Sequence, residues 1–187
     1  MKTKLNLFWF RRDLRLIDNH GLYEVLQSEL PVLPIFIFDT NILDKLENKE
    51  DKRVDFIFQA LEKLNEYLEK QGKSIQIFHG KPLEIYENLS QQYEIGNVFC
   101  NEDYEPYAII RDQEIKDFLA SKKINFYQFK DQVIFQKDEI TKADGKPYTV
   151  YTPYSKQWLL KFNEQSLEFF ASEKKLENLL NVEKQNF

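Results

Sequence analysis

The sequence has 187 residues and a mass of 22.6 kDa, which suits one ordinary domain with an appended segment. Its 26 basic and 31 acidic side chains give a net charge of -5, which argues against a general nucleic-acid binder. The single cysteine excludes a disulfide framework, and no run approaches the roughly 18 apolar residues of a membrane span. We therefore expect a cytoplasmic protein that neither enters a membrane nor holds a metal ion.

Five short apolar runs have the near-continuous character of parallel strands that are buried on both faces. They span residues 5–10, 33–38, 75–78, 97–101 and 124–129. Stretches with apolar residues at helical spacing lie between them, over residues 22–30, 54–68, 85–93 and 108–119. This alternation predicts an α/β fold, a Rossmann-like doubly wound sheet of five parallel strands in the order 3-2-1-4-5 with helices on both faces.

The pattern changes after about residue 130. Residues 133–136 and 148–152 are short β-like runs around a polar turn, and residues 154–170 have a weak helical periodicity. We therefore predict an α/β domain over residues 1–131, followed by an irregular extension with linker helices over residues 132–187.

The last stretch, residues 172–187, has a narrow apolar face made of Leu176, Leu179 and Leu180. Three leucines are too few to form a core of their own. We expect this face to be exposed and to mark an interface with a missing partner.

Ligands of open α/β sheets bind beyond the carboxyl ends of the strands, near the point where the strand order reverses. Residues 11–19, 39–43 and 101–112 follow the first, second and fourth predicted strands and should meet there. They combine arginines, carboxylates and aromatic rings, which suit a planar ligand with a polar edge. Catalytic spacings such as Ser-His-Asp do not stand out, so these residues indicate a binding crevice without catalytic groups.

Several polar residues have a structural interpretation. Asp13 and Arg15 fit an ion-pair network that ties loops to the sheet, and Asn19 fits the N-cap of the first helix. His79 fits the end of a strand, and Cys100 fits a small core residue at the end of another.

The same segments resemble those of a known family, the N-terminal α/β domain of DNA photolyases and cryptochromes. Residues 7–19, LFWFRRDLRLIDN, resemble its opening signature WFRxDLRxxDN, and residues 34–39 resemble its PVFxxD pattern. Residues 101–112 are similar to its N-x-x-x-EPY-x-x-x-RD segment, and residues 145–158 to its G-x-PY-x-V-[FY]-TPF-x-x-x-W segment. The four matches occur in family order, which makes the resemblance specific.

The resemblance implies a deoxyribodipyrimidine photo-lyase, which uses FAD in a helical C-terminal domain to repair pyrimidine dimers in DNA with light. The α/β domain of many members holds a second, light-harvesting chromophore, which is a folate, a deazaflavin or FMN. The helical domain of the same polypeptide, which would contact damaged DNA, is expected beyond Phe187. We expect the 187-residue chain alone to lack FAD and to be inactive.

The resemblance also indicates which chromophore fits. The family's folate site has a His after the second strand and an Asn-Glu pair near the fourth, whereas this loop has no His and Tyr107-Ala108 replaces the pair. This favours a deazaflavin or FMN. By the resemblance, the cofactor-binding residues are Arg11, Phe36, Phe38, Asp39, Arg53, Asp103 and Glu105.

The chain is thus expected to be the antenna domain of a photolyase. Two alternatives stay open: a cryptochrome-type light-sensor domain, and a stand-alone α/β module that binds a partner or nucleotide and catalyses nothing. The signature segments do not separate them.

Overall fold

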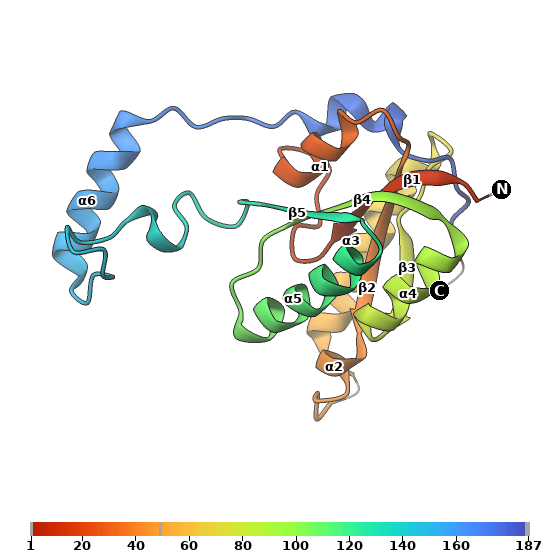
Figure 1. The fold of residues 1–187 in the computed structure, drawn as a ribbon, viewed down its shortest axis with the longest axis horizontal. Helices are drawn as coiled ribbons and strands as arrows, with labels where there is room; N and C mark the ends of the chain where they lie inside the picture. The colour runs from red at the N-terminus through yellow and green to blue at the C-terminus, as the bar shows by residue number, and fades with distance from the viewer. Residues whose placement is uncertain (1, 49, 186–187) are drawn as a thin grey trace.

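The computed structural model describes residues 2–48 and 50–185 and contains one five-stranded sheet. The strands are β1 (Lys4–Phe10), β2 (Val32–Asp39), β3 (Gln76–Gly80), β4 (Glu94–Asn101) and β5 (Asn125–Phe129). All neighbouring strands pair in parallel, in the order β3-β2-β1-β4-β5 (Figure 1). The predicted fold class and strand order are confirmed.

Helices cover both faces of this sheet. The covering helices are α1 (His20–Leu26), α3 (Lys52–Glu69), α4 (Pro82–Gln92) and α5 (Pro106–Ser121). Alternate residues of β1 point to opposite faces: Phe8 and Phe10 join the apolar cluster of α1 and α3, whereas Leu7 and Trp9 join that of α4 and α5. Because both faces are buried, β1 needs apolar side chains at successive positions.

Side-chain caps and a proline set where the helices begin. Asn19 caps α1, as predicted, because its Oδ1 accepts a hydrogen bond from the backbone N–H of Leu22 at 3.1 Å. Pro82 occupies the first turn of α4, where no backbone donor is required. A short helix that the sequence did not predict, α2 (Thr40–Leu43), begins where Asp39 accepts from the backbone N–H of Asn41 at 3.0 Å.

After β5 the chain leaves the sheet, and we call this excursion, residues 131–169, the arm (Figure 1). It contains a 3-10 turn, η1 (Lys137–Glu139), and helix α6 (Tyr151–Glu164), whose residues are all at least partly exposed. The β-like runs predicted at residues 133–136 and 148–152 are wrong, because both lie in the arm without a neighbouring strand among the described residues.

Helix α6 also differs from its prediction, since it ends at Glu164 instead of continuing to residue 170. The chain beyond it is extended because its end is anchored to the body. The backbone N–H of Phe170 donates to Asp18 Oδ1 at 2.9 Å, and the Phe170 ring stacks on His20 with 3.8 Å between ring centroids.

The returning segment, which includes η2 (Ser172–Asn178), packs against α1 and the edge of the sheet. Leu176 and Leu179 are each only 3% exposed and Leu180 is half-buried, so the expected exposure of these leucines is wrong. Leu179 forms a parallel bridge with Val32. The apolar face therefore finds its partner within the chain. The last two residues of the predicted extension lie outside the described residues.

Candidate functional site

A crevice of about 550 Å³ opens at the carboxyl ends of β1 and β2, beside the first turns of α3 and α5. It lies where the strand order reverses, as expected for this fold. The structure brings all seven predicted cofactor-binding side chains to its lining: Arg11, Phe36, Phe38, Asp39, Arg53, Asp103 and Glu105.

Arg11, the residue after β1, holds the wall of the crevice in place. Its Nη1 donates to both carboxylate oxygens of Asp112, at 2.8 and 2.6 Å, and its Nη2 donates to the backbone oxygen of Asn101. Only 6% of the Arg11 side chain is exposed. These contacts tie β1 to β4 and α5, so Arg11 fixes the shape of the crevice and is not a free anchor for a ligand.

Asp39 and Tyr107 form a second fixed contact. The Tyr107 hydroxyl donates to Asp39 Oδ2 at 2.6 Å, and Arg111 Nη1 lies 4.0 Å from the same oxygen. Burial, together with the bond to Asp39, raises the pKa of Tyr107 to about 12, so this phenol keeps its proton at neutral pH. Tyr107 and Arg111 belong to the segment 101–112 that was predicted to meet here, but they are not among the seven expected cofactor-binding residues; their i, i+4 spacing places them on one face of α5.

The mouth of the crevice is more exposed. Arg53, with 76% of its side chain exposed, pairs with Asp51 at 2.6 Å, and this hydrogen bond lowers the pKa of Asp51 to about 2. Arg12, which belongs to the predicted segment 11–19 but not to the seven expected residues, lies 3.4 Å from Asp103 and 3.7 Å from Glu105. Exposed ion pairs of this kind contribute little to stability, so Arg53 and Glu105 can exchange partners for a polar ligand.

Aromatic rings line the inner part. Phe36 and Phe38 meet edge to face with 5.0 Å between ring centroids. Trp9, in the predicted first strand, also reaches the crevice. The guanidinium carbons of Arg111 and Arg11 lie 4.7 and 5.1 Å from its ring centroid.

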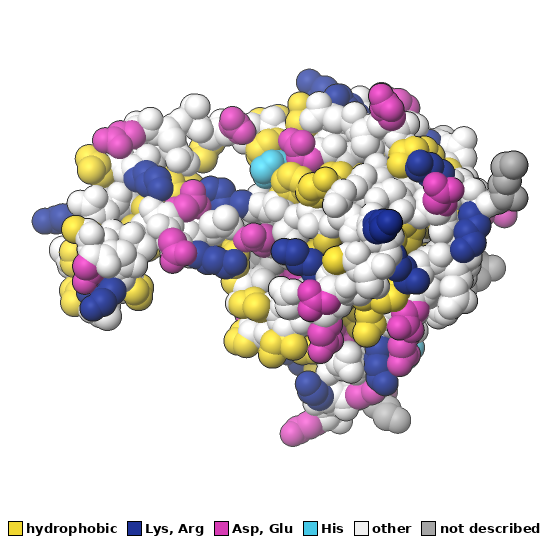
Figure 2. Space-filling view, in the orientation of Figure 1, with side chains coloured by type: hydrophobic (Ala, Val, Ile, Leu, Met, Phe, Trp, Pro, Cys, Tyr) yellow, Lys and Arg dark blue, Asp and Glu magenta, His cyan; other side chains and the backbone are white. Residues whose placement is uncertain are grey.

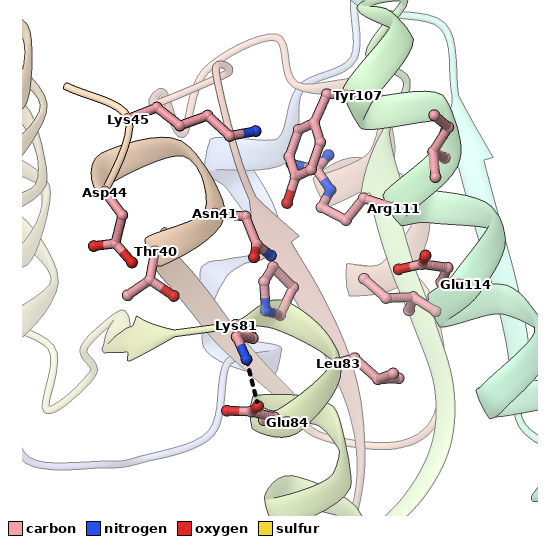
Figure 3. Close-up of a pocket in the computed structure, with 13 residues that line it drawn as sticks. Thr40, Asn41, Asp44, Lys45, Lys81, Leu83, Glu84, Tyr107, Arg111 and Glu114 are labelled. Atoms are coloured by element: carbon pink, nitrogen blue, oxygen red, sulfur yellow. Dashed lines mark ion pairs between the residues drawn. The ribbon is translucent and has the colours of Figure 1, made fainter.

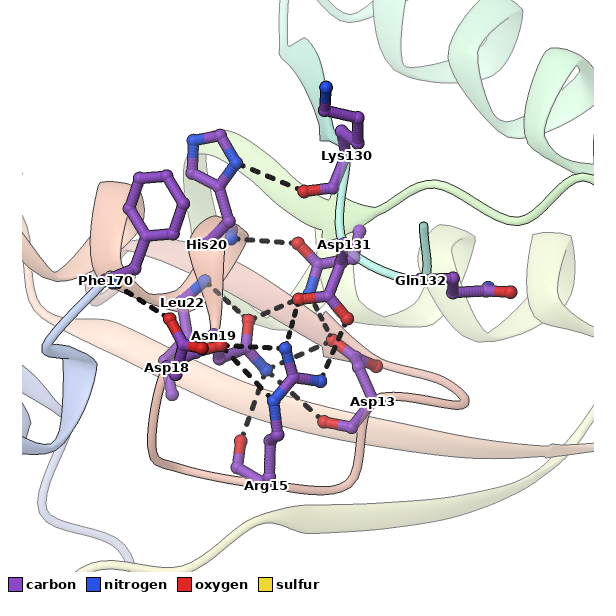
Figure 4. Close-up of polar contacts among 12 residues, drawn as sticks. Asp13, Arg15, Asp18, Asn19, His20, Leu22, Lys130, Asp131, Gln132 and Phe170 are labelled. Atoms are coloured by element: carbon purple, nitrogen blue, oxygen red, sulfur yellow. Dashed lines mark hydrogen bonds and ion pairs between the residues drawn. The ribbon is translucent and has the colours of Figure 1, made fainter. Parts of the chain in front are cut away.

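The structural interpretation of Asp13 and Arg15 agrees with their contacts (Figure 4). Asp13 is buried, and its Oδ2 accepts from the side-chain amides of Asn101 and Asn19, at 2.6 and 3.2 Å. Arg15 Nη1 donates to Asp131 Oδ2 at 2.9 Å. The network joins the β1–α1 loop to β4 and to the start of the arm.

The remaining candidates show no sign of reactivity. Cys100 is fully buried, and burial raises the pKa of its thiol to about 12, so it is not a nucleophile at neutral pH. His79 lies exposed near the end of β3. Within residues 2–48 and 50–185, no three His, Cys, Asp or Glu side chains group closely enough to hold a metal ion. None of the helices described there is long and apolar enough to cross a membrane.

The family model of DNA photolyase matches residues 6–173. The chain belongs to the DNA photolyase family. It is 33% identical over 152 residues to a deoxyribodipyrimidine photo-lyase of Synechococcus sp., a match that covers 81% of this chain and 31% of that protein. The chain thus spans about a third of the length of this curated photolyase.

Two solved structures share its fold. The photolyase of Sulfolobus tokodaii, described as holding two FAD molecules with the implication of a novel light-harvesting cofactor, is 30% identical with a TM-score of 0.63. The match covers 72% of this chain and 32% of that photolyase. The cryptochrome of Synechocystis sp. is 18% identical with a TM-score of 0.79, over 92% of this chain and 37% of that cryptochrome, which shows the fold alone.

Proposed function

We propose that the chain is the antenna domain of a cytoplasmic deoxyribodipyrimidine photo-lyase and holds a flat light-absorbing dye in the crevice. The observation that carries this proposal is the meeting of the seven side chains at one 550 Å³ crevice. This volume lies in the range of sites that enclose one small organic ligand.

The residues suit a dye that absorbs light and passes its excitation on to FAD. Phe36 and Phe38 offer apolar wall, and Arg53 and Glu105 are the charged groups able to turn toward its polar edge. The buried contacts of Arg11 hold the walls in one geometry. Fixed orientation is the main requirement here, because no bond of the dye has to be broken.

A deazaflavin or FMN fits this proposal better than a folate. Tyr107 is committed to Asp39, and this position belongs to the Asn-Glu pair in the family's folate site. The FAD-binding helical domain and the contact with damaged DNA are proposed for the longer polypeptide, since the curated photolyase is about three times as long as this match. The division into an α/β domain over residues 1–131 and an extension over residues 132–187 is likewise a proposal.

Titration of the 187-residue chain with FMN, a deazaflavin and a reduced folate, followed by dye fluorescence, tests the antenna role. We expect saturable binding of FMN or the deazaflavin, weakened several-fold by Arg53→Ala and by Glu105→Ala. Lys70→Ala and Glu66→Ala, at exposed positions on or next to α3, serve as charge-matched controls and should bind like the wild type. Preference for the folate, or equal binding by all four variants, would contradict the proposed site.

A cryptochrome-type light sensor is the second candidate, favoured by the fold shared with the Synechocystis cryptochrome. Light-dependent repair of dimer-containing DNA separates the two. We expect no repair by the 187-residue chain alone, and repair once it is joined to a family helical domain with FAD bound. A joined protein that binds FAD and repairs nothing would favour the sensor.

A further inference from the structure

A second cavity of about 570 Å³, shown in Figure 3, shares lining residues with the crevice. It opens between α2, the start of α4 and one face of α5, and Lys45, Lys81 and Glu114 are among its lining residues. Among the residues that the structure describes, two line both cavities, Tyr107 and Arg111. We call this shared pair the partition.

The partition is held in place by contacts on both of its sides. The Tyr107 hydroxyl is fixed to Asp39 at 2.6 Å, and the Arg111 guanidinium carbon lies 5.7 Å from the centroid of the Tyr107 ring. The ammonium group of Lys45 lies 5.5 Å from the same centroid. Arg111 is buried and donates from Nε and Nη2 to Asp112 Oδ1, at 3.1 and 2.9 Å.

The two members of the partition differ in what their removal would do. Arg111 belongs to the buried ion-pair group that includes Arg11 and Asp112, so its loss would leave buried charge unpaired. Tyr107 is half-buried near the start of α5 and carries no charge, so shortening its side chain removes the hydrogen bond to Asp39 but leaves the ion pairs of Asp112 with Arg11 and Arg111 in place.

We propose that Tyr107 is a specificity-determining residue that limits the length of the ligand in the crevice. With the ring in place, the crevice accommodates a tricyclic dye with a short tail. A flavin dinucleotide carries a second phosphate and a second ring system, which in this proposal extend past Tyr107 toward the second cavity. This inference rests on the proposed function and deepens it, since it selects mononucleotide-sized dyes over dinucleotides.

The test compares the affinities of the 187-residue chain for FMN and FAD, measured by equilibrium dialysis. We expect the wild type to bind FMN at least about ten-fold more tightly than FAD. Tyr107→Ala should bring the two affinities to within about three-fold of each other, mainly by a gain for FAD. Tyr107→Leu leaves a smaller gap and should disturb folding less. It should move the ratio of the FMN and FAD affinities in the same direction.

Two controls separate ring volume from other effects. Tyr107→Phe removes the hydroxyl and keeps the ring, so its affinity ratio should stay close to that of the wild type. Tyr67→Ala, at an exposed position on α3, should leave the ratio unchanged. Circular dichroism checks that each variant is folded.

The outcomes are distinguishable. FMN binding with an unchanged ratio in folded Tyr107→Ala and Tyr107→Leu would overturn the length limit and leave the antenna proposal intact. Equal binding of FMN and FAD by the wild type would also overturn the length limit alone. A folded wild type that binds neither flavin would overturn the proposed function and this inference together.

Discussion

Tyr107 and Asp39 reach across the crevice from α5 and from the end of β2, and their oxygens meet at 2.6 Å. The bond requires a protonated phenol, because the Tyr107 hydroxyl is its donor. Because Tyr107 has a pKa of about 12 in the folded chain, against about 10 when unfolded, its proton is bound more tightly by the folded state.

This difference predicts a loss of stability at alkaline pH. The contribution of Tyr107 is fully present below pH 10 and is lost as the pH rises from about 10 to about 12, because the unfolded state releases the proton first. The urea midpoint should fall more between pH 9 and pH 11 in the wild type than in Tyr107→Phe. Tyr67→Phe, at an exposed position, should behave like the wild type. An equal fall in all three proteins would contradict the assignment.

Asp13→Asn should destabilise the chain although it keeps the shape of the side chain. Both oxygens of Asp13 accept hydrogen bonds, Oδ1 from the backbone N–H of Arg11 and Oδ2 from the amides of Asn19 and Asn101. An amide group would turn one N–H toward these donors, at a cost of about 1–3 kcal/mol in the free energy of unfolding. Chemical denaturation measures it, with Asp44→Asn at an exposed site as control. Unchanged stability would show that the network can reorient.

Gly21→Ala should also lower stability, although alanine favours helices in general. An added Cβ would lie 2.6 Å from Asn101 Oδ1 and 3.1 Å from the Phe8 ring, inside van der Waals contact. Moving these buried groups costs about 1–3 kcal/mol. Thermal unfolding is the measurement, with Glu24→Ala in the same helix as control. A gain in melting temperature for Gly21→Ala would show that α1 can shift away from β4.

Lys73→Met should release the C-terminal segment from the sheet. The Lys73 ammonium group donates to the backbone oxygens of Glu177, at 3.1 Å, and of Leu179, and to Asn181 Oδ1 at 2.8 Å. Hydrogen exchange over residues 176–182 should become faster while β1 stays protected. Lys70→Met, at an exposed position, serves as control. Unchanged exchange would mean that Leu176 and Leu179 hold the segment without the lysine.

The sheet could be predicted because its signal is local. Strands buried on both faces are mostly apolar, and β1 and β2 show this within their own residues, with Asn6 and Asp39 as their buried polar positions. The β-like runs of the arm have similar composition, but strand formation depends on a neighbouring edge that the arm does not meet. The burial of Leu176 could not be predicted either, because its partner α1 lies about 150 residues earlier in the sequence.

The crevice, too, could be predicted from the sequence only in part. Arg11, Asp39 and Glu105 come together because each follows the carboxyl end of a strand, which the strand order alone determines. Which of them stays free for a ligand depends on side-chain partners, and the sequence did not reveal the commitment of Arg11 to Asp112. Tyr107 lies in the predicted segment 101–112, but its position in the partition could not be predicted, since it follows from its contact with Asp39.

Both ends of the arm meet at one side chain, His20. Its Nδ1 lies 3.2 Å from the backbone oxygen of Lys130, and its ring stacks on Phe170 (Figure 4). The two ends of the arm are therefore held close together, so the arm is a long loop on the body. The entropy of closing such a loop changes slowly with its length. In the view of Figure 2, acidic and basic side chains are interspersed over the surface of the body. We therefore expect that the arm can be exchanged or shortened between Lys130 and Phe170 while the sheet keeps its connectivity.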